Sequence, residues 1–274
     1  MPLYREFARI DAGCDRLPDE STILRFRHLL ERHELAANIL QTINAQLLKR
    51  GLMLKAGTVV DATLLSAPSS TKNSSGERAP EMHQTKKGDQ WYFGMKAHIG
   101  ADADSGLVHT VTTTAANEHD ITQASNLLHG QETDVFADSG YRGVDKRVEV
   151  QAQPPDVEWH VAMTPGKRRV LGKRGTDAIK ERIEKIKASV RAKVEHPFRG
   201  VKGQFGHIKV RYRGLAKNTS QLLVMFALSN KNEPRRGWCV RMQPDGQDGM
   251  AKWGNSSQKR RNGVKQLHNG CISR

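Results

Sequence analysis

Two carboxylates occupy positions where predicted strands end or are buried. Asp138 follows the apolar run Val135–Ala137 and precedes a Ser-Gly pair, which is typical of a strand that stops at a sharp turn. Asp61 lies inside the apolar, β-branched segment 57–65. A carboxylate in such a segment is costly unless it is paired or binds a metal ion. We therefore consider both aspartates candidates for metal-dependent chemistry.

A third carboxylate belongs to a predicted helix that begins at Thr176. Arg191 and Glu195 are four residues apart and so are neighbours on its surface, while Pro197 kinks or ends the helix just beyond them. If the helix resumes, Lys202 lies on about the same face. One apolar stripe is predicted along this helix, made of Ile179, Ile183, Ile186, Val190 and Val194.

Each acidic residue also has a plainer interpretation. Asp138 alone is equally well explained as the cap of the next helix. Asp61 is explained without function if it faces solvent from an edge strand. Arg191 and Glu195, taken as an isolated pair, form a surface ion pair worth well under about 1 kcal/mol. The three carboxylates together favour a cluster of hard oxygen ligands, which suits Mg²⁺ or Mn²⁺. Two such ions about 4 Å apart support phosphodiester chemistry.

The composition indicates a polyanionic partner. The 274 residues carry a formal net charge of +15 and a pI of about 9.9, which favours nucleic acid first and an anionic membrane surface second. No run of 18 apolar residues and no secretory signal are present, so we expect no membrane association. Cys14, Cys239 and Cys271 are widely spaced, which disfavours both a disulfide framework and a zinc site. We expect a cytosolic protein.

The remaining elements can be read in chain order. Residues 1–50 predict two amphipathic helices, the first capped by Asp19 or Ser21 and the second ended by Gly51. Residues 66–90 predict a long basic loop. The further predicted elements are a β-hairpin (91–100 and 107–114), a helix from Asn117 through Leu128, a helical segment after Asp138, a strand (158–163), a basic loop (164–175) and an apolar helix (221–228).

Several longer motifs resemble one family, from about residue 4 to residue 230. They read LPDESTILRFRHLLE, GTVVDATLLSAPSSTKN, EMHQTKKGDQWYFGMKAHIGADADSGLVHTV, VFADSGYRG and RAKVEHPFRGVKGQFGHIKVRYRGLAKN. The chain resembles the bacterial DDE transposases of the insertion-sequence-five family. The resemblance implies an α/β fold with a ribonuclease H-like mixed sheet flanked by helices and a short helical N-terminal segment. It implies a nucleoid-associated, cytoplasmic enzyme of bacteria.

The resemblance also implies roles for individual residues. Asp61, Asp138 and Glu195 would be the catalytic, metal-binding triad for Mg²⁺ or Mn²⁺. Arg191 and Lys202 match the Arg-x₃-Glu-x₆-Lys signature around the third carboxylate. The implied partner is DNA, both inverted-repeat ends and target DNA, bound by a homo-oligomer. The predicted DNA-binding residues are Arg191, Lys202, Arg199, Lys86, Lys87, Arg142, Arg211 and Arg213.

The sequence departs from the family pattern in ways that leave an alternative open. Relatives have a longer N-terminal helical region, and Ala188 stands where they often carry Tyr. Gly200 and Gly203 replace larger residues and should weaken a helix by roughly 1 kcal/mol each. The predicted domains are a partial helical segment (1–52), the catalytic domain (53–230) and a basic, disordered tail (231–274). The alternative is a decayed, inactive DNA-binding remnant; a third interpretation is a general nuclease or resolvase on the same fold.

Overall fold

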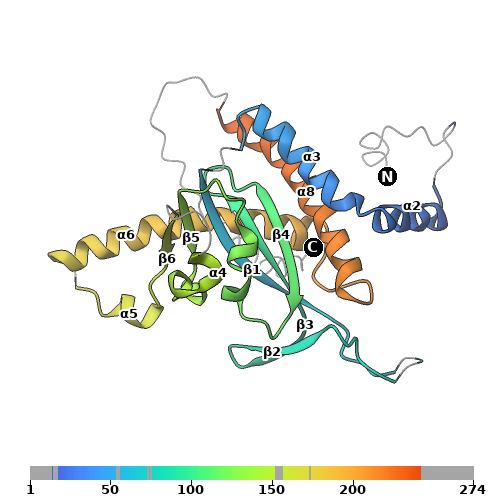
Figure 1. Cartoon of the computed structure of the whole chain (residues 1–274), viewed down its shortest axis with the longest axis horizontal. Helices are drawn as coiled ribbons and strands as arrows, with labels where there is room; N and C mark the ends of the chain where they lie inside the picture. Colours follow the sequence, from blue (N-terminus) through green and yellow to red (C-terminus); the bar gives the residue numbers. More distant parts are fainter. Residues whose placement is uncertain are drawn as a thin grey trace, which may run out of the picture. The chain divides into compact units, whose positions relative to one another are not determined.

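The fold is built around a mixed sheet of six strands, shown by a computed structural model in Figure 1. Its strand order is β2-β3-β1-β5-β6, and β4 pairs with another part of β3. β1, β3 and β4 are antiparallel neighbours, whereas β5 and β6 run parallel to β1. The strands are β1 (Gly57–Ser66), β2 (His83–Lys87), β3 (Gln90–Asp102), β4 (Val108–Ala115), β5 (Asp134–Ala137) and β6 (Glu158–Val161).

Helices flank this sheet and precede it, as the predicted ribonuclease H-like class requires, so the fold class is confirmed. The α-helices are α2 (Glu20–Arg32), α3 (Leu35–Lys49), α4 (Val148–Gln151), α5 (Pro165–Arg169), α6 (Thr176–Arg191), α7 (Glu195–Arg199) and α8 (Leu215–Arg241). The 3₁₀ segments are η1 (Asp120–Gln123), η2 (Ser125–Leu127), η3 (Ser139–Tyr141), η4 (Val144–Lys146) and η5 (Ala192–Val194), and η6 (Gly200–Gln204) is a π-helical turn.

The structure describes residues 14, 18–53, 56–72, 74, 76–151, 157–172 and 174–241, the last nine of them as backbone only. Most of the predicted tail lies outside this part, although α8 continues beyond Lys231 to Arg241. The described elements belong to the compact unit Met1–Gly237, apart from the end of α8. No helix in the described part is both long and apolar enough to cross a membrane.

The two faces of the sheet carry separate hydrophobic cores. On one face Val59, Met95 and Ile99 pack against Val194 and Phe226, which lie in η5 and α8. The opposite core contains residues from β1, β5 and the η1–η4 segments, namely Val60, Ala124, Leu127, Val135, Ala137, Tyr141 and Val144. Because side chains alternate along a strand, each strand position can be assigned to one core or the other.

A buried amide pair joins the N-terminal helix α3 to α8 and β4. Asn230 of α8 donates its Nδ2 hydrogen to Asn44 of α3 over 2.8 Å. Both amides also donate to the carbonyl oxygen of Val108 in β4, over 2.6 and 3.1 Å. Since buried amides without partners would cost stability, this network holds α3, α8 and β4 together, and Figure 1 shows α3 and α8 side by side.

Several sequence predictions of local structure are corrected by the structure. The loop predicted over 66–90 contains strand β2, and the basic loop 164–175 contains the short helix α5. The helix predicted from Asn117 through Leu128 consists of two short 3₁₀ turns. The apolar stripe of α6 is buried only at its C-terminal end, because Ile179, Ile183 and Ile186 are 46–62% exposed. The predicted cap Asp19 is confirmed, since it accepts from the Thr22 N–H.

Candidate active site

Asp61 and Asp138 lie next to each other on neighbouring parallel strands. β1 and β5 pair from Gly57↔Asp134 to Val60↔Ala137. The residues that follow this last pair are Asp61 and Asp138. β1 lies between β3 and β5, which rules out the edge-strand interpretation of Asp61. The cap interpretation of Asp138 is correct in part, because its Oδ1 accepts the Gly140 N–H over 2.8 Å at the start of η3.

Both aspartates point to the same face of the sheet. Residues two apart along a strand point to the same face, so Asp61 shares a face with Val59, and Asp138 with Phe136. Both of these apolar residues pack in the core that faces α8 and η5. Val194 of η5 is buried in that core, and β1 contacts η5 directly. Glu195 follows Val194 in sequence. The fold therefore brings the third predicted carboxylate to the face of the sheet that carries the two aspartates.

Glu195 is nevertheless not packed against the two aspartates. Its side chain is exposed, and its charge is not among those that shift the pKa of Asp61. In the described part of the chain, two other sets of His, Asp and Glu bring three ligand atoms within 4.8 Å of one another, and the predicted triad is not among them. The role of Glu195 as a metal ligand remains a prediction.

Asp61 lies in an environment that strongly perturbs its carboxylate. Its pKa is raised from 3.8 to about 6, chiefly by burial and also by the charge of Asp138, whereas an N–H bond from Ala62 (2.7 Å) and the charge of Arg191 act in the opposite direction. Arg191 is partly exposed, and its Nε is buried without a hydrogen-bond partner in the described residues. A cation with an unused donor thus lies near the aspartates.

A fourth carboxylate contributes to the charge of this region. η1 packs on η3, and Asp120 of η1 raises the pKa of Asp61. Burial, followed by the charges of Asp120, Asp61 and Asp138, raises the pKa of Tyr141, whose hydroxyl is buried without a hydrogen-bond partner among the described residues. The Nζ of Lys96 lies 3.0 Å from Asp120. Sequence analysis placed Asp120 only inside the helix predicted from Asn117 through Leu128, and that pattern gave no signal of proximity to Asp61.

The two aspartates fit a divalent metal ion by the chemistry of their donor atoms. Each uses Oδ1 for a backbone N–H, from Ala62 or Gly140, and no bond within the described residues occupies Oδ2. Carboxylate oxygens are the ligands that Mg²⁺ and Mn²⁺ prefer. A cation would also relieve the repulsion that raises the pKa of Asp61.

The cluster of His109, His129 and Glu132 fits a metal less well. Glu132 is buried, and its carboxylate accepts the backbone N–H groups of His129, Gly130 and Gln131 over 2.6–3.0 Å. Gln131 N–H donates to Nδ1 of His129 over 3.2 Å, so a neutral ring carries its proton on Nε2, which faces Glu132 at 3.4 Å. That nitrogen has no lone pair for a metal. This cluster therefore stabilises the local fold rather than binding a metal.

The second such cluster is a surface ion pair. Nε2 of His160 lies 2.7 Å from Asp134 Oδ1, and Nδ1 lies 3.8 Å from Glu158, whose side chain is 75% exposed. The imidazole also stacks on Phe136, with ring centroids 4.8 Å apart. Both ring nitrogens are directed at carboxylates, and these contacts satisfy the group without a metal.

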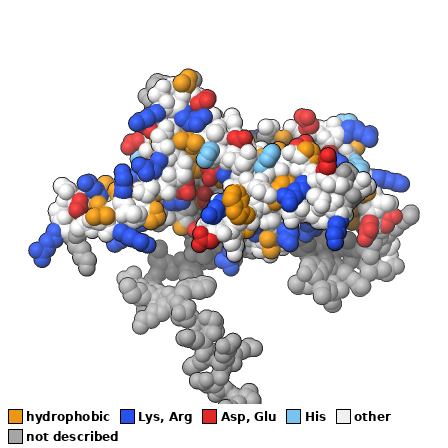
Figure 2. Space-filling model, turned by 90° about the horizontal axis from the view of Figure 1, so that it is seen from below, with side chains coloured by type: hydrophobic (Ala, Val, Ile, Leu, Met, Phe, Trp, Pro, Cys, Tyr) orange, Lys and Arg blue, Asp and Glu red, His pale blue; other side chains and the backbone are white. Residues whose placement is uncertain are grey.

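The predicted DNA-binding residues occupy several surface segments. Lys86 and Lys87 lie on β2, Arg199 ends α7, and Arg211 and Arg213 precede α8. These five side chains are exposed, as is Arg142, whereas Arg191 and Lys202 are partly buried. Burial lowers the pKa of Lys202, and the nearby charge of Lys87 lowers it further. Figure 2 shows Lys and Arg spread over one face with acidic side chains between them.

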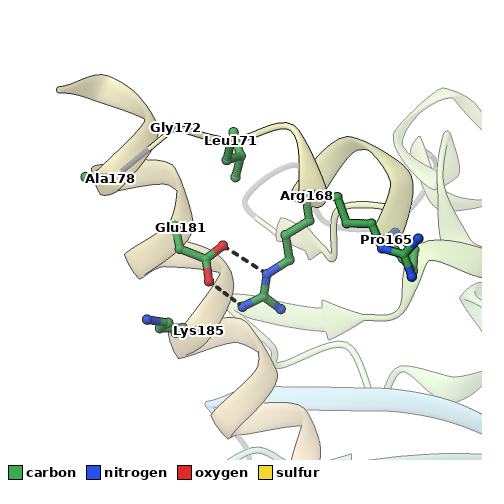
Figure 3. Close-up of a pocket in the computed structure, with 8 residues that line it drawn as sticks. Pro165, Arg168, Leu171, Gly172, Ala178, Glu181 and Lys185 are labelled. Atoms are coloured by element: carbon green, nitrogen blue, oxygen red, sulfur yellow. Dashed lines mark hydrogen bonds and ion pairs between the residues drawn. The ribbon is translucent and has the colours of Figure 1, made fainter. Parts of the chain in front are cut away.

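Two hollows flank the basic helix α5. A cavity of about 420 Å³ at the C-terminal end of β6 is lined by Arg142, Lys167, Lys187 and Trp159 among others. The other, of about 720 Å³, lies between α5 and α6 and is shown in Figure 3, where Arg168 reaches Glu181 through two hydrogen bonds of 3.0 and 2.9 Å. Lys167 and Lys187 were missed by sequence analysis because they stand in ordinary basic runs.

One glycine of the C-terminal signature has a packing role. A Cβ at Gly200 would lie 2.9 Å from the Ser229 hydroxyl oxygen of α8, so glycine allows η6 to pack closely on that helix. Gly203 has open space by comparison, with its closest contact at 3.9 Å. Glycine at position 200 weakens the helix, but it also permits the close packing of η6 on α8.

Comparison with known proteins now places the chain in a family. The model of the Transposase DDE domain matches residues 53–231, and the chain belongs to that family. The matched range contains Asp61, Asp138 and Glu195. Among solved structures, the chain is similar to a piggyBac transposase in a synaptic complex with hairpin DNA, at 10% identity and a TM-score of 0.43. The similarity covers 86% of this chain and 58% of that one, so the chain spans less than two thirds of that transposase.

Proposed function

We propose that this chain is a DNA transposase that uses Mg²⁺ or Mn²⁺ to cut and join DNA at the ends of an insertion sequence. The observation that carries the proposal is the placement of Asp61 and Asp138 side by side on β1 and β5. They face the elements that carry Arg191 and Glu195, within the range that matches the transposase family. The pKa of Asp61, raised to about 6, adds support, because perturbed carboxylates cluster at functional sites.

The residues divide the proposed reaction between them. Asp61 and Asp138 would hold the ions, and Glu195 would complete one coordination shell. When bound, such an ion would supply neutralisation of the phosphate charge and activation of the attacking water. In the first step water attacks phosphorus and the strand leaves as a 3′-hydroxyl. In the second step that hydroxyl attacks the phosphorus of a target phosphodiester, and the target strand leaves as a new 3′-hydroxyl that takes up the proton. Arg191, with its unused Nε donor, would contact a phosphate oxygen or orient Glu195.

The basic residues would hold the polyanionic substrate, and a homo-oligomer would hold two DNA ends together. Support comes from the net charge of +15 and from the exposed cations on β2, after η3 and before α8. Such contacts give affinity that falls steeply with salt. Arg142, Lys167 and Lys187 line the cavity beside the C-terminal ends of β5 and β6, next to the proposed site of cleavage.

The test is cleavage of inverted-repeat DNA in Mg²⁺ by the full chain. We expect Asp138→Ala to lower the cleavage rate by about a thousandfold or more, since it removes a metal ligand from the reaction. Asp104→Ala is the matched control, because Asp104 is an exposed aspartate of the β3–β4 turn, and it should cleave at the wild-type rate. Equal cleavage by wild type and Asp138→Ala would overturn the proposal.

The second candidate is a DNA-binding remnant without catalytic activity. The observation that favours it is the exposed Glu195, which does not join the aspartates in a three-ligand group. A remnant would bind DNA without sequence preference and would lose affinity steeply as salt rises. Binding of this kind, with no strand cleavage in either Mg²⁺ or Mn²⁺, would decide for the remnant. Cleavage without strand joining would indicate a nuclease or resolvase.

A further inference from the structure

The tip of the β2–β3 hairpin exposes an aromatic side chain among cations. Trp91 is 68% exposed and pairs with Lys86 across the hairpin. Lys87 pairs with Gln90 beside it. Gly88, with φ of +62°, forms the tight turn together with Asp89. Solvent exposure of a whole indole is unfavourable, so this residue is a candidate for contact with a partner.

The cations beside this hairpin lack acidic partners. Lys87 and the partly buried Lys202 are close enough for the charge of one to lower the pKa of the other. Neither they nor Lys86 forms an ion pair with any described residue. Asp89 is the one acidic residue of the turn. Two lysines held near each other without a counter-ion repel, and a bound phosphate would relieve that repulsion.

The hairpin leaves the sheet at the end where the aspartates lie. Asp61 pairs with Ile99 on β3, and Trp91 is eight residues away along the same strand. Because side chains alternate, Trp91, Phe93 and Ile99 point to the face that carries Asp61. Eight residues of strand span about 27 Å, which is about eight nucleotides at 3.4 Å each. Figure 1 shows β2 and the adjoining part of β3 beyond the other strands.

We propose that the β2–β3 hairpin is a DNA-binding arm in which Trp91 stacks on an unpaired base within about one helical turn of the cleavage site. Lys86, Lys87 and Lys202 hold the phosphates of the same strand. The inference rests on the proposed function, because it places the contacted strand beside the aspartates. An exposed aromatic surrounded by unpaired lysines is the pattern that binds single-stranded nucleic acid. The cations around it disfavour a second, equally basic copy of this chain as the partner.

The experiment measures the affinity of the full chain for fluorescein-labelled DNA by fluorescence anisotropy. One probe is a duplex with an unpaired tract about eight nucleotides from the element end, and the other is the same duplex fully paired. We expect Trp91→Ala to bind the first probe about tenfold more weakly, since stacking contributes about 1–3 kcal/mol per base. Trp91→Phe should recover most of the loss. Lys87→Ala should weaken binding of both probes and make the salt dependence less steep.

Val148→Ala is the matched control, because Val148 is 76% exposed on α4, outside the hairpin. It should bind both probes like wild type. Wild-type affinity of Trp91→Ala for the unpaired probe would overturn the inference, and so would a change in oligomeric state without a change in DNA affinity. Failure of the proposed function gives a different result, because Asp138→Ala would then cleave like wild type whatever Trp91→Ala binds.

Discussion

Two carboxylate clusters lie at the two ends of strand β5, beside its parallel neighbour β1, and they differ in how the carboxylates are satisfied. At the N-terminal end, Glu132 is buried and accepts three backbone N–H groups. At the C-terminal end, Asp61 and Asp138 accept one N–H each and repel one another. A carboxylate that only supports the fold has its oxygens satisfied by the protein. The aspartates retain free oxygens, and the pKa of Asp61 is raised, as is common in binding sites.

The largest effect that tests this comparison is on folding stability. We expect Glu132→Gln to lower the free energy of unfolding by about 3 kcal/mol. Hydrogen bonds to a buried charged group contribute about 1.5–3 kcal/mol each, and the NH₂ group of the glutamine would face backbone N–H donors that it cannot accept from. Asp138→Asn should change it by less than about 1 kcal/mol. Urea denaturation of both variants measures the difference. Equal losses in the two variants would show that Asp138 is as structural as Glu132.

A somewhat smaller effect should appear in the pH dependence of the metal-free protein. The pKa of Asp61 is about 6 in the folded state and 3.8 otherwise, so the folded protein binds this proton more tightly. Its contribution to stability is present below pH 4 and is lost as pH rises through 6. We expect Asp61→Asn, which does not titrate, to gain about 2 kcal/mol relative to wild type between pH 4 and pH 7.

The comparison between variants is needed because a buried histidine titrates in the same range with the opposite sign. Burial lowers the pKa of His98 from 6.5 to about 4, so its contribution is lost as pH falls. Both proteins retain His98, and its effect cancels in the difference. The measurement is urea denaturation in chelator at several pH values. A stability difference that does not vary with pH would show that Asp61 has an ordinary pKa.

Sequence patterns predicted the elements whose signals are local. The Asp19 cap, the hairpin of β3 and β4 and the strand that ends before Asp138 follow from turn residues and alternation within a few positions. β2 was missed because its charged, exposed residues HQTKK acquire strand structure only by pairing with β3. The Ile residues of α6 show a helical period, but burial depends on whether the sheet extends beneath them, which periodicity does not contain.

The positions of some residues of the candidate site could be predicted from the sequence, and those of others could not. The adjacency of Asp61 and Asp138 follows from the register of the parallel pair, in which Asp138 comes directly after β5, beside Asp61 in the middle of β1. The separate position of Glu195 depends on where η5 and α7 turn after α6, a tertiary feature that no spacing gives. Asp120 acts on Asp61 because η1 packs on η3. The hydrogen-bond network around Glu132 includes His109 and Thr58 from two other strands, and no sequence motif predicted it.

The smallest expected effect is the response of stability to metal, and it separates the members of the acidic site. At ten times Kd, Mg²⁺ that binds only the folded state should raise the free energy of unfolding by about 1.4 kcal/mol. Glu132→Gln should retain this increase from its lower baseline, since its carboxylate is saturated by backbone donors. Asp61→Asn should lose most of it, because a ligand oxygen and a charge are removed.

Glu195→Gln tests whether Glu195 binds the ion. In the DNA-free structure Glu195 is exposed and does not form a three-ligand group with the aspartates. If α7 already contributes a ligand, Glu195→Gln should lose part of the response. If Glu195 joins only when DNA is bound, its response in the free protein should equal that of wild type and should differ once inverted-repeat DNA is added. Thermal melting with and without Mg²⁺ measures all four proteins. An equal shift in all of them, Asp61→Asn included, would show that the aspartates do not bind the ion.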